Sequence, residues 1–256
     1  MIKRVRIIPV LTVDNEKLVK TIKFKKPTYI GDPINAVKIF NEKEVDEIVL
    51  LDITATKEDR EPNFTFIEDI CSEAFMPFAY GGGITTIQQI EKLFKLGIEK
   101  IVLNSSIETN FDLITEASTI FGSQSIVISI DLKKNIFGKF QLMKNSGTKK
   151  IKYTLEDYIK KIEEHGAGEI FLNVIDRDGT YKGYDYDLIH KVSNLTTLPV
   201  IACGGANNIT SFKTAIKKGA SACAAGSLFV YSGKAKGILI NYPSQHKLET
   251  EIYSKI

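Results

Sequence analysis

Two glycine clusters occupy matching positions in the chain, and each has residue types that bind phosphate. They are Gly81-Gly82-Gly83 and Gly204-Gly205, and a serine follows the last glycine of each by 22 residues. Glycine lets backbone N–H groups approach a phosphate closely, and hydroxyl or amide side chains add hydrogen bonds. The double pattern favours two phosphate sites over two ordinary tight turns. The candidate phosphate-binding residues are Gly82, Gly83, Asn104, Ser105, Gly204, Gly205, Gly226 and Ser227.

Asp131 is the leading candidate for acid/base chemistry. It ends the apolar run 125–131, where a carboxylate is costly unless it serves chemistry or a strong hydrogen bond. The matching position in the first half of the chain holds Thr12, whose hydroxyl cannot act as a general acid or base near neutral pH. Asp14 is the nearby carboxylate that could replace it. Residues expected to contact a substrate at the same site are Lys20, Asp52, Asp176, Asp178 and Thr180.

Lys20 and Cys203 each have a second interpretation. Lys20 is either a cation for a phosphate or substrate, or a solvated loop lysine. Cys203 precedes a glycine pair, so a catalytic thiol stays open, although a small buried strand residue is favoured.

Four charged residues stand at the starts of predicted strands. If they point inward, two cations and two anions would neutralise one another on the floor of a barrel, because buried charges must be paired. Spacing alone favours solvent-facing charges or a structural plug, since that end of a barrel usually serves stability. The four residues are Arg6, Glu47, Lys100 and Glu169.

The elements that must position these residues alternate regularly along the chain. Apolar, β-branched runs predict eight strands, and helix-length segments with apolar residues at i, i+3 and i+4 separate most of them. The pattern predicts an α/β fold, a (βα)8 TIM barrel, in which active-site residues lie at the C-terminal ends of the strands. The strands are expected at 5–11, 47–52, 77–81, 100–104, 125–131, 169–175, 199–203 and 220–225, and the clearest helices at 33–43, 86–96, 112–121, 155–165, 185–193 and 209–218.

An internal repeat indicates that the barrel is built from two related halves. Pro77, Gly82, Gly83 and Ser105 each have an identical residue 122 positions later. Glycines that end several helices, at positions 97, 122, 166 and 219, support the same alternation. No linker separates the halves, so we expect one domain over residues 1–256.

Composition narrows the class of protein further. The 256 residues are 43% apolar, and 34 basic against 31 acidic residues give a net charge of +3, which favours neither a nucleic-acid nor a membrane partner. Without a signal sequence or a membrane-length apolar run, a cytoplasmic location is expected. Three separated cysteines and three histidines form no ligand spacing, so no metal, disulfide framework or cofactor is expected.

Eight segments of the chain match one known family. They are 6–8, 31–33, 51–55, 81–84, 121–124, 166–170, 175–180 and 195–199. Through them the sequence resembles the cyclase subunit (HisF) of imidazole glycerol phosphate synthase along nearly its whole length. That resemblance implies a two-fold-repeated barrel that binds a bisphosphate and receives ammonia from a glutaminase docked beneath it. It implies a catalytic role for Asp131 and an ammonia gate formed by the four strand-start charges, whereas Thr12 replaces the strand 1 aspartate of the family.

Other segments are similar to a narrower branch of HisF paralogues, which are associated with amidation of acetamido sugars in surface polysaccharide or flagellin glycan pathways. This branch implies a HisH-like glutaminase and a separate sugar amidotransferase as partners. The segments are 24–27, 41–47, 60–64 and 238–243. We therefore expect an ammonia-conducting barrel subunit. The alternatives are a genuine histidine-pathway cyclase in which Thr12 or Asp14 substitutes, the related sugar-phosphate isomerase, and a non-catalytic phosphate-binding scaffold.

Overall fold

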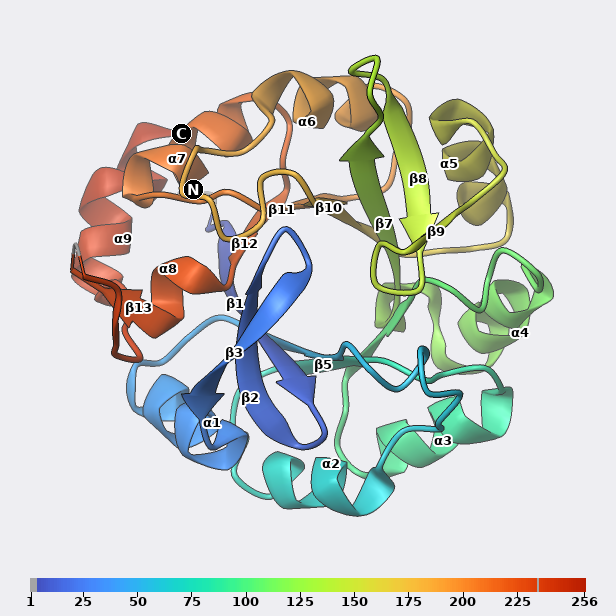
Figure 1. Cartoon of the computed structure of the whole chain (residues 1–256), viewed down its shortest axis with the longest axis horizontal. Helices are drawn as coiled ribbons and strands as arrows, with labels where there is room; N and C mark the ends of the chain where they lie inside the picture. The colour runs from blue at the N-terminus through green and yellow to red at the C-terminus, as the bar shows by residue number, and fades with distance from the viewer. Residues whose placement is uncertain (1–3, 234) are drawn as a thin grey trace.

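The computed structural model describes residues 4–233 and 235–256, and its centre is a closed barrel of eight parallel strands (Figure 1). Each barrel strand pairs with the next in chain order, and the last pairs with the first. The predicted (βα)8 fold is confirmed. The barrel strands are β1 (Arg6–Asp14), β4 (Ile48–Asp52), β5 (Phe78–Gly81), β6 (Lys100–Leu103), β7 (Ile126–Lys134), β10 (Glu169–Val174), β11 (Val200–Cys203) and β12 (Ala222–Ala225).

Alternation along each strand separates two apolar layers. On β1, Ile7 and Leu11 belong to the large cluster that packs against the helices, whereas Ile8 and Val10 belong to a smaller cluster inside the barrel. Because side chains alternate across a strand and both faces are covered, the strands read as continuous apolar runs. This is why the sequence revealed them.

Helices surround the barrel, and polar side chains start most of them. Asp32, Thr86 and Asn208 each accept a hydrogen bond from a backbone N–H in the first turn of the helix that follows, which satisfies a group that the helix leaves free. Gly97, Gly122, Gly166 and Gly219 all have positive φ, as helix-ending glycines should. The helices are α1 (Pro33–Glu42), α2 (Phe64–Cys71), α3 (Ile87–Lys95), α4 (Asp112–Phe121), α5 (Leu155–Glu164), α6 (Tyr186–Ser193), α7 (Ile209–Lys217), α8 (Ser227–Val230) and α9 (Gln245–Glu251), with short 3-10 turns at Ser123–Ser125 and Tyr253–Lys255.

The two halves of the barrel also match in an unexpected way. The first strand of each half continues past the barrel and pairs with an antiparallel strand, β1 with β2 (Lys17–Ile22) and β7 with β8 (Phe140–Lys144). A further strand extends each ladder, β3 (Lys25–Gly31) and β9 (Lys149–Lys150). The half-barrel repeat therefore includes a hairpin at the C-terminal end of its first strand.

Some expected boundaries were wrong. The first predicted strand ended at residue 11 and the fifth at residue 131, but pairing with the hairpins carries them to Asp14 and Lys134. The eighth unit is irregular, because α8 has four residues and is followed by the small hairpin β13 (Tyr231–Ser232) and β14 (Gly237–Ile238). Within the described residues, no helix has the length and apolar character that crossing a bilayer requires.

Candidate functional site

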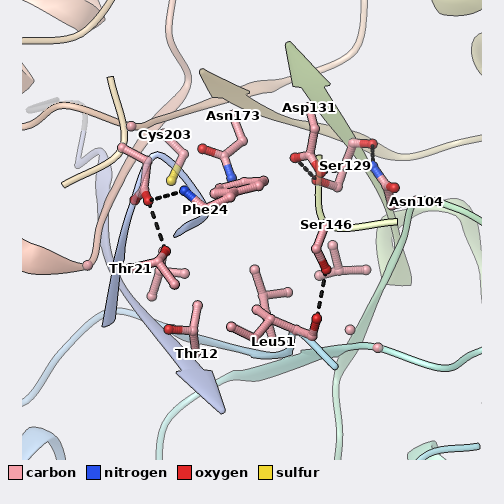
Figure 2. A pocket seen from close by; sticks show the side chains of 18 of the residues that line it. Thr12, Thr21, Phe24, Leu51, Asn104, Ser129, Asp131, Ser146, Asn173 and Cys203 are labelled. Carbon is pink, nitrogen blue, oxygen red and sulfur yellow. Dashed lines mark hydrogen bonds between the residues drawn. The ribbon is translucent and has the colours of Figure 1, made fainter. Parts of the chain in front are cut away.

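A cavity of about 260 Å³ opens at the C-terminal ends of the barrel strands (Figure 2). It contains both glycine clusters and most of the polar residues that the sequence singled out. Side chains from the two hairpins, Phe24 and Ser146, also line it. The predicted residues at the cavity are Thr12, Lys20, Asp52, Gly82, Gly83, Asn104, Ser105, Asp131, Asp178, Gly204, Gly205, Gly226 and Ser227.

Asp131 is buried in the wall of this cavity. Its carboxylate accepts hydrogen bonds from the Ser129 hydroxyl at 3.2 Å and the Asn104 side-chain amide at 3.3 Å. Burial raises the pKa of Asp131 to about 7, because the charged form loses its hydration. A carboxyl group that titrates near neutral pH can both take and give a proton, as acid/base catalysis requires.

Thr12 lies across the cavity from Asp131 in Figure 2, and its hydroxyl donates to the backbone carbonyl of Val19 on β2. The hydroxyl is thus held by the hairpin. Asp14, the alternative carboxylate, does not line the cavity and instead accepts a hydrogen bond from the Asn15 side chain at 3.0 Å. Asp131 therefore faces no second carboxylate from β1.

Lys20 and Asp178 form an ion pair inside the cavity. The Lys20 ammonium lies 2.7 Å from the Asp178 carboxylate, which also accepts from the Thr21 hydroxyl at 3.1 Å. Lys20 is buried on β2, so the interpretation as a solvated loop lysine was wrong. The pair joins the β2–β3 hairpin to the loop after β10 and places one cation and one anion at the mouth.

The glycine clusters have no room for side chains. A Cβ on Gly83 would lie 2.4 Å from the Arg60 carbonyl, and one on Gly205 would lie 2.3 Å from the Gly183 carbonyl. All of Gly82, Gly83, Gly204 and Gly205 have positive φ, which side-chain-bearing residues rarely adopt. These turns bring bare backbone to the cavity surface, as phosphate binding needs, and the tight packing also requires glycine.

Ser105 and Ser227 occupy equivalent places in the two halves but have different partners. The Ser105 hydroxyl donates to Asn104 at 3.1 Å and accepts from the Asn145 backbone N–H at 2.9 Å. Ser227 opens α8, and its carbonyl accepts from the Tyr181 hydroxyl at 2.8 Å. The β8–β9 turn thus contacts one glycine-serine pair, and the loop after β10 contacts the other.

Of the three remaining substrate-binding candidates, one lines the cavity and two do not. Asp52 lines the cavity, but one of its oxygens accepts backbone N–H bonds from Thr54 and Ala55, both at 2.9 Å. This oxygen of Asp52 therefore stabilises the turn that follows β4. Asp176 accepts from the Lys134 backbone N–H at 2.6 Å, and Thr180 donates to a carbonyl within its own loop. Neither of these two lines the cavity.

Two further residues complete the wall: Asn173, which sequence reasoning missed, and Cys203, for which it favoured a small buried strand residue. Asn173 is buried on β10 beside Asp131, and its side-chain oxygen has no hydrogen-bond partner. Cys203 adjoins it on β11, and burial raises the pKa of this thiol to about 12, so it is not an activated nucleophile. In the part of the chain that the structure describes, no three His, Cys, Asp or Glu side chains form a metal-binding group.

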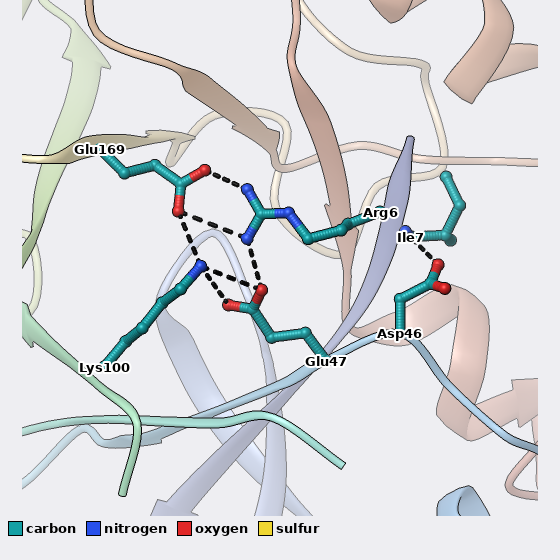
Figure 3. A network of polar contacts seen from close by, with 6 residues as sticks. All are labelled: Arg6, Ile7, Asp46, Glu47, Lys100 and Glu169. Atoms are coloured by element: carbon teal, nitrogen blue, oxygen red, sulfur yellow. Dashed lines mark hydrogen bonds and ion pairs between the residues drawn. The ribbon is translucent and has the colours of Figure 1, made fainter. Parts of the chain in front are cut away.

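The four strand-start charges converge at the opposite end of the barrel (Figure 3). Arg6 donates to both Glu47 and Glu169, and the Lys100 ammonium lies 3.2 Å from Glu47 and 3.1 Å from Glu169. Both glutamates are buried, so the solvent-facing interpretation was wrong. Two cations thus face two anions, so that each buried glutamate is paired and the four charges sum to zero.

Comparison of the sequence with known proteins identifies the family to which this barrel belongs. The family model described as "Histidine biosynthesis protein" matches residues 6–236. The chain belongs to the HisF family of histidine biosynthesis proteins. It is 40% identical over 248 residues to the HisF subunit of imidazole glycerol phosphate synthase from Natranaerobius thermophilus, covering 96% of this chain and 98% of that one.

Two other relatives are more similar to this HisF-like chain. A protein of Pseudomonas aeruginosa, provisionally named imidazole glycerol phosphate synthase subunit hisF2, is 47% identical over 250 residues, covering 97% of this chain and 99% of that one. A protein of Vibrio vulnificus, provisionally named subunit hisF3, is 48% identical over 243 residues, 94% of each chain.

Proposed function

We propose that this HisF-like chain is the ammonia-conducting barrel subunit of a glutamine-dependent amidotransferase system, in which the amidated product is an acetamido sugar for surface glycan biosynthesis. A HisH-like glutaminase would bind the face that carries Arg6 and Lys100, and a separate sugar amidotransferase would use the ammonia. The sugar assignment rests on the sequence segments shared with the narrower HisF branch.

The observation that carries the proposal is the contrast between the two ends of the barrel. The four-charge ring is complete at the floor, with both glutamates buried and paired. At the mouth, Thr12 stands where the family has an aspartate, and its hydroxyl is bound to a backbone carbonyl. Loss of one acid/base group slows such chemistry by roughly 100- to 10,000-fold, whereas ammonia transfer does not need that group.

The barrel interior between the two ends is apolar. Its inward-facing side chains form one cluster of small and branched residues, with Phe171 as the largest. Ammonium would lose its hydration there at high cost, whereas uncharged ammonia would not. The charged ring below and the apolar layer above are therefore suited to passing the uncharged form. The residues of this layer are Ile8, Val10, Val49, Ala79, Val102, Val127, Phe171, Ile201, Cys203, Ala222 and Ala224.

The test is a reconstituted reaction with a HisH-like glutaminase and a sugar amidotransferase from the same organism. Glutamate release and amidated sugar are measured together, first with glutamine and then with an ammonium salt. Lys100→Met should lower the ratio of sugar product to glutamate while leaving the ammonium-driven reaction unchanged. Lys95→Met is the matched control, because Lys95 is exposed on α3. An unchanged ratio for Lys100→Met would contradict ammonia transfer through this ring.

A cyclase of histidine biosynthesis is the second candidate, and the Asp131 carboxyl favours it. Asp131 titrates near neutrality and faces a cavity with two glycine turns, which suits acid/base work on a phosphorylated substrate. Ammonia-dependent turnover of the bisphosphate substrate of the histidine-pathway cyclase separates the two. Turnover by the wild type would establish that the chain is a cyclase. Turnover by Thr12→Asp but not by the wild type would show that the cavity can still bind the substrate, and that the native protein has a different task.

A further inference from the structure

Two hairpins carry more positive charge than the net charge of the whole chain. Residues 17–31, which contain β2 and β3, have five lysines and no acidic residue. Residues 132–152, which contain β8 and β9, have seven lysines and no acidic residue. The whole chain has a net charge of +3, so everything outside these two segments carries −9. The overall balance hides a strong separation of charge.

The two hairpins meet over the mouth of the cavity. A Cβ on Gly147, in the β8–β9 turn, would lie 3.1 Å from the ring of Phe24, in the β2–β3 turn. Hydrogen bonds to backbone carbonyls anchor both turns to the loops that follow barrel strands, from the Lys23 backbone N–H to Asp178 at 3.0 Å and from the Ser146 hydroxyl to Ile53 at 2.7 Å. The two lysine-rich hairpins therefore adjoin each other at the mouth of the cavity, which Phe24 and Ser146 of their turns line.

Most of these lysines have no ion-pair partner. Lys20 and Lys144 are bound to Asp178 and Glu108, and Lys134 lies 3.6 Å from Asp185. Across residues 4–233 and 235–256, no ion pair involves the other exposed hairpin lysines. These are Lys17, Lys23, Lys25, Lys26, Lys139, Lys149, Lys150 and Lys152.

Large apolar side chains are exposed on the same hairpins. Ile136 and Phe137, at the β7–β8 turn, are 92% and 80% exposed, and Ile22 and Tyr29 on the other hairpin are more than half exposed. Large exposed apolar side chains on two adjoining hairpins are candidates for the apolar part of an interface with another macromolecule. A small anion would be bound by lysines alone and would leave these four side chains in water.

We propose that the two hairpins are the docking surface for the protein that accepts the ammonia, and that this partner presents acidic side chains around an apolar centre. The inference rests on the proposed function, since ammonia that leaves the cavity into water near neutral pH would be protonated and lost. A protein seated on the hairpins covers the mouth. Opposite charges would steer the encounter, and the apolar residues would supply the buried centre of the interface.

A protein fits this end of the barrel better than an anionic lipid surface does. The loop between β4 and α2 also lies at the C-terminal end of the strands, and it exposes Glu58, Asp59 and Glu61. With Lys57 and Arg60 counted, residues 53–63 have a net charge of −1, so a bilayer with negative headgroups would attract the lysines and gain nothing from this loop. A protein surface can match both signs of charge at their separate places.

Binding of the purified sugar amidotransferase to the full chain tests the proposal. We expect Ile136→Ser with Phe137→Ser, and separately Lys25→Glu with Lys139→Glu, to weaken binding by about tenfold or more. Raising the salt concentration should weaken binding of the wild type and affect the lysine variant less. Ile120→Ser and Lys160→Glu, on the outer helices α4 and α5, are matched controls that should bind as the wild type does.

The outcomes separate this inference from the proposed function. Unchanged binding by both hairpin variants, or no binding by the wild type, would overturn the docking surface. So would wild-type binding to phosphatidylglycerol vesicles that the hairpin variants lose. The proposed function is judged independently, by the Lys100→Met ratio of product to glutamate. Hairpin variants that lose glutamine-dependent product but keep wild-type glutamate release would support docking at the mouth.

Discussion

Lys100→Met removes one of the two cations that neutralise the charged ring at the barrel floor. In the wild type its ammonium lies 3.2 Å from Glu47 and 3.1 Å from Glu169, whose side chains are 2% and 6% exposed. Methionine keeps much of the side-chain volume but leaves two buried carboxylates with Arg6 as their remaining partner in the ring. We expect this change to destabilise the folded chain, and a second change to reverse part of the loss.

The magnitude follows from burial. Breaking a buried ion pair by removing one partner costs about 3–5 kcal/mol, because the charge left behind is uncompensated. The Lys100 side chain is 21% exposed, so water screens part of the interaction, and we expect a loss of about 2–3 kcal/mol. Glu47→Gln should also destabilise. The double variant restores neutrality, so its loss should be smaller than the two single losses together by about 1–2 kcal/mol.

Urea unfolding of the wild type, both single variants and the double variant measures this coupling, with circular dichroism as the signal. Lys95 and Glu91 on α3 supply the control cycle, because their ion pair at 2.7 Å is more than half exposed at both ends. Such a pair should show a coupling of about 0.3–0.5 kcal/mol. A ring coupling no larger than that of the control would refute the reasoning that the floor charges are buried and mutually neutralised.

Three further predictions concern the cavity. Asp131 keeps its proton to about pH 7 when folded but only to about pH 4 when unfolded, so stability should fall as pH rises between these values. Asp131→Asn should flatten that fall in urea titrations at pH 5 and pH 8. Cys203, with its pKa near 12, should react with iodoacetamide at pH 8 at least about 100-fold more slowly than in urea. Gly205→Ala, with a carbonyl 2.3 Å from the new methyl group, should lose more stability on thermal unfolding than Gly138→Ala, which has open space at its positive φ.

The barrel could be predicted because its evidence is local. Each parallel strand is buried on both faces, so it appears as an apolar run, and glycines with positive φ end the helices before it. The hairpins lack such a signal. In β2 and β8, short buried pairs such as Leu18-Val19 and Leu142-Met143 lie among lysines. These segments are too short and too polar to be recognised as strands, because they form strands only by pairing with β1 and β7.

The site was predictable in position but not in its contacts. The C-terminal ends of the strands fixed where Asp131 and the glycine turns would meet. The pairing of Lys20 with Asp178 joins residues 158 positions apart, and no local pattern signals it. Asn173 was missed for a similar reason, because an amide in an apolar strand becomes informative only when its oxygen is seen to have no partner.

The charged floor bears most directly on what the barrel does. Four apolar side chains could fill the same space, and replacing a buried ion network by apolar residues often leaves stability unchanged or raises it. Stability alone therefore gives no reason for Arg6, Lys100 and the two glutamates to close the barrel. A polar ring beneath an apolar interior has a physical use if a small polar molecule must enter from below, because side chains can exchange partners as it passes. The double-mutant cycle measures the stability of this ring, and the ratio of sugar product to glutamate tests the proposed passage of ammonia through it, so a structural role and the proposed transport role are separable by experiment.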